Sequence, residues 1–138
     1  MSTFSGDPKA FDVDTFTGDI AGSCLCGNIT VTIFNKPNLF KERNGHQCFC
    51  SNCRKFSGCS GSNNIVIGKD HVRVDDPRGP IHTLPTDDAD DFYVLPLGIF
   101  PRIPAPEFEL FSAHKHDWQA HNEGVKRYKY MSSSGEMG

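Results

Sequence analysis

Five of the six cysteines of this chain fall into two short segments whose spacing is typical of metal ligands. Cys48, Cys50 and Cys53 lie within six residues, and Cys24 and Cys26 form an earlier pair directly before a glycine. Zn²⁺ binds thiolates tetrahedrally at about 2.3 Å, so one tight loop can supply several corners of its coordination sphere. Three thiols leave one corner open, which would let a bound zinc meet a substrate.

The same spacings are compatible with two other roles. A purely structural zinc could be built from any four of these cysteines, which would close the coordination sphere. A redox or disulfide role is a third alternative, because short cysteine spacings also serve that chemistry. The spacing alone leaves these alternatives open.

Length and composition favour a single domain. The chain has 138 residues and a hydrophobic content of 37%, which is low for a domain that must close a core unaided, so a bound metal would offset the shortfall. There are 14 Lys and Arg against 17 Asp and Glu, for a net charge of −3, and no dense basic segment indicates a nucleic-acid partner. The sequence contains no run of about 18 apolar residues, so it predicts no membrane span.

The first residues bear on the compartment. Residues 1–14 contain neither the basic segment nor the apolar stretch of a secretory leader. We therefore expect a cytoplasmic protein with reduced thiols, and not a secreted disulfide framework. We expect no nucleic-acid partner and no membrane association, and the expected state is a monomer or a homodimer.

Residue patterns predict a mainly β domain. β-Branched and aromatic residues between Gly, Pro and Asp predict strands at residues 28–34, 64–67, 71–74, 92–95 and 125–128. Short helical turns are predicted at residues 53–58 and 112–121. Four prolines between residues 96 and 106 exclude a long helix between the late strands. We expect a flexible arm at residues 1–17, one zinc-binding domain at 18–130 and a flexible tail at 131–138.

Two cysteine motifs carry a family resemblance. Residues 22–29 read Gly-Ser-Cys-Leu-Cys-Gly-Asn-Ile, and residues 48–58 read Cys-Phe-Cys-Ser-Asn-Cys-Arg-Lys-Phe-Ser-Gly. They resemble the glutathione-dependent formaldehyde-activating enzyme family, also called the CENP-V/GFA family, and residues 94–100 and 116–118 are similar to the C-terminal part of its fungal-type members. The resemblance implies the Mss4-like (β-tent) fold, small antiparallel sheets around zinc, and a carbon–sulfur lyase that combines glutathione with formaldehyde.

The resemblance also implies roles for residues of the later motif. Cys48, Cys50 and Cys53 map onto the ligands of the catalytic zinc. Arg54 and Lys55 follow the last ligand directly, so they are the nearest cations that could stabilise an oxyanion or bind the carboxylates of a glutathione-like substrate. The alternative for both cations is an ordinary solvated turn.

The resemblance places Cys24 and Cys26 at a second, structural zinc, shared with a later Phe-Cys-x-x-Cys-Gly motif. This chain has no cysteine after Cys59, and residues 82–92, where that motif would fall, form an acidic segment. Substitute ligands of suitable softness are His46, Cys59, His71 and His82. Alternatively, the pair could share one four-thiolate site with two later thiols. We expect the two cysteine segments to be adjacent in space and the second site to be weaker, partly occupied or empty.

The remaining candidates have ordinary alternatives. Trp118 could line a thiol-substrate pocket, although core packing is the simpler role. His114, His116 and His121 could ligate metal but more often cap a turn or face solvent. The acidic run at 87–91 is most simply a solvated loop, although it could attract Ca²⁺.

Two functions remain. The first is a zinc-dependent carbon–sulfur lyase acting on a thiol adduct of an aldehyde or another small electrophile. The second is a non-catalytic zinc-binding module or a degenerate family member with a structural role. Fold alone does not choose between them, because function resides in the site.

Overall fold

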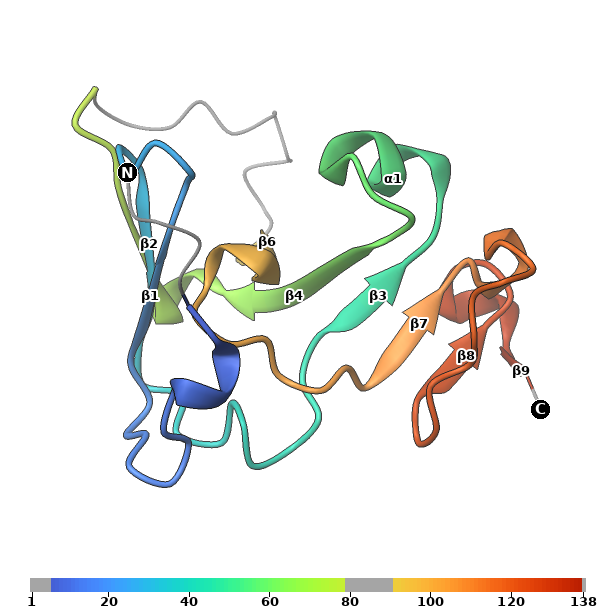
Figure 1. Ribbon diagram of the computed structural model, residues 1–138, viewed down its shortest axis with the longest axis horizontal. Helices are drawn as coiled ribbons and strands as arrows, with labels where there is room; N and C mark the ends of the chain where they lie inside the picture. The colour runs from blue at the N-terminus through green and yellow to red at the C-terminus, as the bar shows by residue number, and fades with distance from the viewer. Residues whose placement is uncertain (1–5, 79–90, 138) are drawn as a thin grey trace.

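The computed structural model describes residues 6–78 and 91–137, and this part is mainly β, as predicted. Its nine strands form two sheets, and its one α-helix is α1 (Ser51–Ser57). The smaller sheet is antiparallel and has the order β1-β2-β5, with β1 (Ile20–Ser23), β2 (Thr30–Ile33) and β5 (Val72–Asp75). Figure 1 shows this sheet at one end of the molecule and α1 above the other sheet.

The larger sheet has six strands in the order β6-β4-β3-β7-β8-β9. These strands are β3 (His46–Cys48), β4 (Ser62–Gly68), β6 (Phe92–Pro96), β7 (Phe108–Leu110), β8 (Lys126–Tyr128) and β9 (Glu136–Met137). β3 pairs with β7, and β7 with β8, in parallel, whereas the other neighbours are antiparallel. The expected, mainly antiparallel β fold is therefore confirmed, and the two parallel pairings were not predicted, because residue alternation specifies which face is buried and not strand direction.

The main core lies between the smaller sheet and the β4–β6 end of the larger one. Val31 and Ile33 alternate with half-buried threonines along β2, and Ile65 and Ile67 face them from β4. A side chain that buries about 80 Å² of apolar surface contributes roughly 2 kcal/mol, so this cluster contributes substantially to the stability of the fold. The cluster positions β4, and β4 pairs with β3, the strand that ends at Cys48.

All five predicted strands are present in the structure, with shifted ends. The sequence did not predict β1, β3, β7 or β9, since these strands have two to four residues and His46–Cys48 contains no β-branched side chain. The helical turn predicted at 53–58 is α1, and that predicted at 112–121 is only a 3₁₀ turn at Ser112–His114. The proline-rich connection before β7 contains no α-helix, as predicted.

Both terminal segments contact the fold. Phe11 and Phe16 pack on Phe40 with ring centroids 5.1–6.0 Å apart, and this group lies against the core. Near the other end, β9 pairs with β8. The predicted domain boundaries at residues 17 and 131 are not decided by these contacts and stay predictions.

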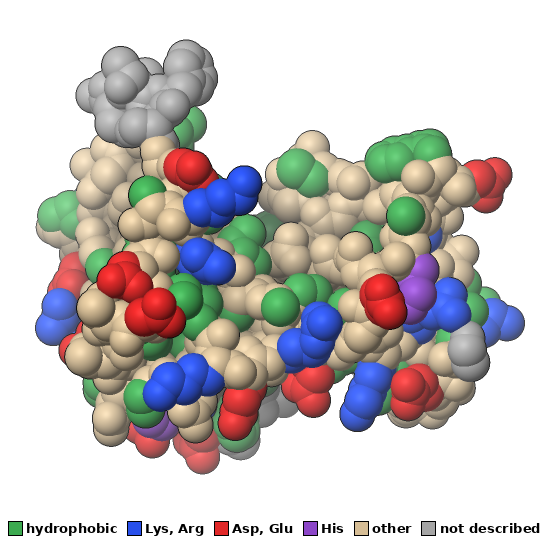
Figure 2. Space-filling view, turned by 60° about the horizontal axis from the view of Figure 1, so that its bottom comes forward, with side chains coloured by type: hydrophobic (Ala, Val, Ile, Leu, Met, Phe, Trp, Pro, Cys, Tyr) green, Lys and Arg blue, Asp and Glu red, His purple; other side chains and the backbone are tan. Residues whose placement is uncertain are grey.

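Charged side chains of both signs are interspersed on the face of the molecule seen in Figure 2. Within residues 6–78 and 91–137, none of the helices has the length and apolar character that crossing a membrane would need.

Candidate metal centre

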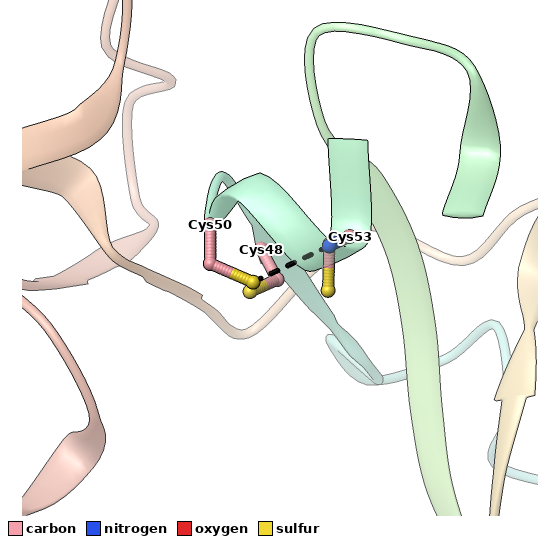
Figure 3. A group of neighbouring side chains, drawn as sticks. All are labelled: Cys48, Cys50 and Cys53. Carbon is pink, nitrogen blue, oxygen red and sulfur yellow. Dashed lines mark hydrogen bonds between the residues drawn. The ribbon is translucent and has the colours of Figure 1, made fainter. Parts of the chain in front are cut away.

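Cys48, Cys50 and Cys53 come together where β3 leads into α1. Cys48 ends the strand, Cys50 precedes the helix and Cys53 lies in its first turn. Their Sγ atoms lie within 4.8 Å of one another, and Figure 3 shows the three thiols turned toward one side. We call residues 48–53 the knuckle. The structure thus brings together the three residues that the sequence predicted as ligands of the first site.

The short helix α1 is held at both ends. Cys50 is its N-cap residue and its Sγ accepts a hydrogen bond from the N–H of Cys53 at 3.4 Å, as a Ser or Asp oxygen does at other helix starts. Gly58 ends the helix in the left-handed conformation with φ 67°, and its N–H donates to Arg54 O at 2.8 Å. These caps hold Cys53 beside Cys50.

The thiols of the knuckle differ in their proton affinity. Burial raises the pKa of Cys48 to about 12, because a thiolate there would lose its hydration. Burial also acts to raise the pKa of Cys50, but hydrogen bonds from the Cys53 N–H and neighbouring groups outweigh it, and the pKa is lowered. A divalent cation would reverse the penalty at Cys48, since a coordinating thiol is deprotonated outright.

The knuckle fits a tetrahedral zinc. With zinc–sulfur bonds of about 2.3 Å, tetrahedral geometry places the sulfurs about 3.8 Å apart, which is compatible with three Sγ atoms inside 4.8 Å. No fourth His, Cys, Asp or Glu joins the group within the described residues. Three protein ligands with an open position are the pattern of a zinc that can meet a substrate.

A buried ion pair supports the knuckle from behind. Glu109, in the middle of β7, has no exposed surface, and its carboxylate accepts hydrogen bonds from Ser112 Oγ at 2.8 Å and from Lys115 Nζ at 3.3 Å. Lys115 Nζ also donates to Ala120 O at 3.0 Å and lies 5.2 Å from the ring centre of Phe49. Phe49 lies between Cys48 and Cys50 in the sequence, so the ion pair contacts the knuckle through this ring.

Sequence reasoning missed this ion pair. The only signal was the order Phe108-Glu109-Leu110, an acid between two apolar residues. That order is equally typical of a strand with one face in water. The partner Lys115 comes from a later turn, and a contact of that kind is not encoded in local spacing.

Polar side chains share the sheet face that carries Cys48. His46 lies two residues before it, and their partners on β4 are Asn64 and Ser62, respectively. All four are buried. Asn64 Nδ2 donates to Ser62 Oγ at 2.8 Å, so the hydroxyl keeps its own proton for another acceptor. Burial lowers the pKa of His46, whose ring stacks on Phe108 at 5.2 Å.

The other candidates of the first site lie at different depths. Arg54 is half-buried, and its Nε is buried without a hydrogen-bond partner in the part of the chain that the structure describes. Lys55 is exposed. Trp118 is 73% exposed and stacks on His116 at 5.6 Å, so it is not a core residue. Of these three residues, only Arg54 has a buried polar atom without a hydrogen-bond partner among the described residues.

Cys24 and Cys26 lie in the turn between β1 and β2, two strands of the smaller sheet. Their Sγ atoms are 3.3 Å apart, and neither belongs to the group formed by the knuckle thiols. Figure 1 shows this turn and α1 well apart on the upper side of the molecule. The expected adjacency of the two segments is wrong, because each is held by a different sheet. The structure therefore gives no support to one shared four-thiolate site.

Among the substitute ligands, none that the structure describes joins Cys24 and Cys26 in a three-ligand group. His46 is buried against Phe108, and His71 Nδ1 lies 3.0 Å from Phe34 O. Cys59 is exposed just after α1. His82 and the acidic run, apart from Asp91, lie outside the described residues.

The later histidines pack on aromatic rings. His114 contacts Phe111 and Tyr130, with ring centroids 5.4 and 5.8 Å away. His116 Nδ1 lies 3.0 Å from Gln119 Oε1. None of the three histidines near residue 116 belongs to a metal-ligand group in the described chain.

Comparison with known proteins agrees with the two cysteine motifs. The model of the family described as glutathione-dependent formaldehyde-activating enzyme matches residues 19–88, slightly more than half of the chain, and this range contains both cysteine segments. No curated protein matches the chain. On the family match, the chain belongs to the glutathione-dependent formaldehyde-activating enzyme family.

Proposed function

We propose that this protein is a zinc-dependent enzyme of the carbon–sulfur lyase class that acts on the adduct of a glutathione-like thiol with an aldehyde. The observation that carries the proposal is the knuckle, where three thiols converge and no fourth protein ligand closes the group within the described residues. Family membership supports a glutathione-dependent, aldehyde-related reaction. We further propose that the chain is a fungal-type CENP-V-like member with the Mss4-like fold.

Cys48, Cys50 and Cys53 would hold the metal. Zinc, when bound, would supply an open coordination position for the substrate sulfur and would lower the proton affinity of that thiol. The N–H of Cys53 donates to Cys50 Sγ, and this hydrogen bond would keep Cys50 in its orientation with or without the metal. Phe49 packs under Lys115 and fixes the spacing of the ligands on either side of it.

The reaction forms one carbon–sulfur bond. The thiol sulfur attacks the carbonyl carbon, the carbonyl π electrons move to oxygen, and the proton released by the thiol neutralises that oxygen, which gives a hydroxymethyl thioether. Addition of this kind needs proximity of the reactants and stabilisation of the oxyanion. It needs no external oxidant or reductant.

Arg54 and Ser62 are the groups that suit the oxyanion. A buried guanidinium donor without a partner costs about 1–3 kcal/mol, and an anionic substrate group would satisfy it. Ser62 lies opposite Cys48 in the sheet and retains a hydroxyl proton to donate. Lys55 and Trp118, both exposed, would contact the outer parts of a thiol substrate.

We expect S-hydroxymethylglutathione synthase activity to be weak or absent while thiol binding is retained. The segment at residues 82–92 lacks the cysteine pair that would complete a second zinc site, and Cys24 and Cys26 would then bind metal weakly. A misplacement of about 1 Å at a catalytic group can cost on the order of a hundredfold in rate. The alternative of a non-catalytic zinc module is favoured if no thiol binds.

Exchange spectroscopy by NMR on formaldehyde, glutathione and their adduct tests the proposal. The zinc-loaded protein is compared with Cys53→Ser and with Cys59→Ser, which removes an exposed thiol outside the knuckle. We expect glutathione binding that is lost in Cys53→Ser and kept in Cys59→Ser, with catalysed exchange weak or absent in the wild type. Equal glutathione binding by the wild type and Cys53→Ser would contradict the proposal that the knuckle holds the substrate thiol.

A further inference from the structure

The pair Cys24 and Cys26 has a geometry suited to chemistry of its own. Their Sγ atoms are in contact at 3.3 Å, and Cys26 is exposed. The side chain between them, Leu25, is 90% exposed, so nothing in the described structure covers the turn. A reagent in solution can therefore reach two thiols that already touch.

The turn holds the pair in this arrangement. Gly27 N–H donates to Cys24 O at 2.9 Å, and Cys24 N–H donates to Ile29 O at 3.1 Å, which closes a tight hairpin end. Gly27 has φ 79°, a conformation that favours glycine. The backbone of the turn thus holds the two thiols close together.

The two thiols are not equivalent. The N–H of Ile29 donates to Cys24 Sγ at 3.3 Å. A hydrogen bond to sulfur stabilises the thiolate, which is the nucleophile in disulfide exchange. The geometry thus makes Cys24 the attacking thiol and Cys26 the neighbour able to resolve an adduct.

We propose that Cys24 and Cys26 form a thiol–disulfide exchange site whose partner is a small-molecule disulfide such as glutathione disulfide. In the first step Cys24 sulfur attacks one sulfur of the disulfide, a new S–S bond forms, and one glutathione leaves as thiolate. In the second step Cys26 sulfur attacks Cys24 sulfur, the protein disulfide forms, and the second glutathione leaves. The protein dithiol is oxidised and glutathione disulfide is reduced to two thiols, with two protons transferred to them.

The proposal does not depend on the knuckle being catalytic. Among the described residues the knuckle has three converging thiols and the turn has two, so a metal is favoured at the former and exchange chemistry at the latter. Cys59 is a matched internal control, because it is an exposed free thiol of the same chain and lies outside the group that the knuckle thiols form.

The test incubates the full, zinc-loaded chain in glutathione buffers of graded disulfide content, quenches it with acid and maps each cysteine by peptide mass spectrometry. We expect the peptide with Cys24 and Cys26 to lose two hydrogens, whereas Cys59 gains only glutathione. Cys26→Ser should accumulate a glutathione adduct on Cys24. In Cys24→Ser, the glutathione adduct on Cys26 should form more slowly than the adduct on Cys24 does in Cys26→Ser, by about tenfold or more.

Two results would overturn the proposal. One is a pair that stays reduced in buffers where Cys59 already carries glutathione. The other is a second equivalent of zinc that protects Cys24 and Cys26 from the disulfide until a chelator removes it, which would assign the pair to metal binding.

Discussion

The two cysteine segments show how burial and support separate otherwise similar sequence motifs. The knuckle at 48–53 lies at the end of a strand in the larger sheet, with a capped helix on one side and a buried ion pair behind it. The turn at 24–27 closes a hairpin of the smaller sheet and its Cys26 is exposed. A metal at the knuckle would stabilise structure on several strands, whereas a change at the turn affects a single hairpin end.

The largest expected difference is in metal-linked stability. Cys50→Ser should lose the metal and lower the free energy of unfolding by about 4 kcal/mol or more, because metal-binding energy is folding energy in small sites. Cys26→Ser, at the turn, should change it by about 0.5 kcal/mol or less. Urea unfolding with metal analysis checks both. Full stability in a metal-free Cys50→Ser protein would break the comparison.

The buried ion pair should matter at the knuckle and not at the turn. Glu109→Gln leaves Lys115 buried without its charge partner, and breaking such a pair costs about 3–5 kcal/mol. The double variant with Lys115→Met should recover part of the loss, since no uncompensated charge remains. Urea unfolding of the single and double variants measures this. A neutral Glu109→Gln would show that Phe49 needs no such support.

Close packing on Phe49 gives a smaller effect. A methyl group on Gly61 would lie 2.7 Å from the Phe49 ring, so Gly61→Ala should destabilise the fold by about 1–3 kcal/mol and weaken metal affinity. Gly98→Ala is the control, because a methyl group there meets nothing within 4 Å. Equal stability and equal metal affinity of the two variants would show that the Phe49 ring moves aside without loss of stability.

Without metal, the two segments should differ in reactivity with pH. The Ile29 N–H and then Cys26 lower the pKa of Cys24 to about 7, and burial raises that of Cys48 to about 12. Since thiolate is the reactive form, iodoacetamide should label Cys24 with a midpoint near pH 7 and leave Cys48 largely unlabelled at pH 8. If Cys24 and Cys48 were labelled with the same pH profile, the two segments would not differ in reactivity.

The sequence predicted the knuckle well because its information is local. Ligands at positions 48, 50 and 53 need only one turn of chain, and a cysteine can replace Ser or Asp as the helix cap. The mainly β class and five strands were also predictable from β-branched residues. These features depend on neighbours within a few residues.

The rest depends on contacts between distant segments. The parallel pairing of β3 with β7 joins residues about 60 positions apart, and neither three-residue strand has an alternation that reveals its partner. Ser62 lies opposite Cys48 for the same reason, and although Lys115 follows Glu109 by only six positions, no helix or strand spacing brings the two together. The expected adjacency of the two cysteine segments failed for this reason, since shared chemistry does not determine which sheet holds each segment.

The most direct test of the central claim is a titration of the reduced full chain with Co²⁺, followed by its thiolate-to-cobalt and tetrahedral absorption bands. The account predicts one equivalent bound with three-thiolate intensity, a rise in intensity when glutathione supplies a fourth thiolate, and the same titration for Cys26→Ser. A spectrum that glutathione does not change and that Cys26→Ser abolishes would contradict it, because it would mean a closed four-thiolate site drawing on both segments.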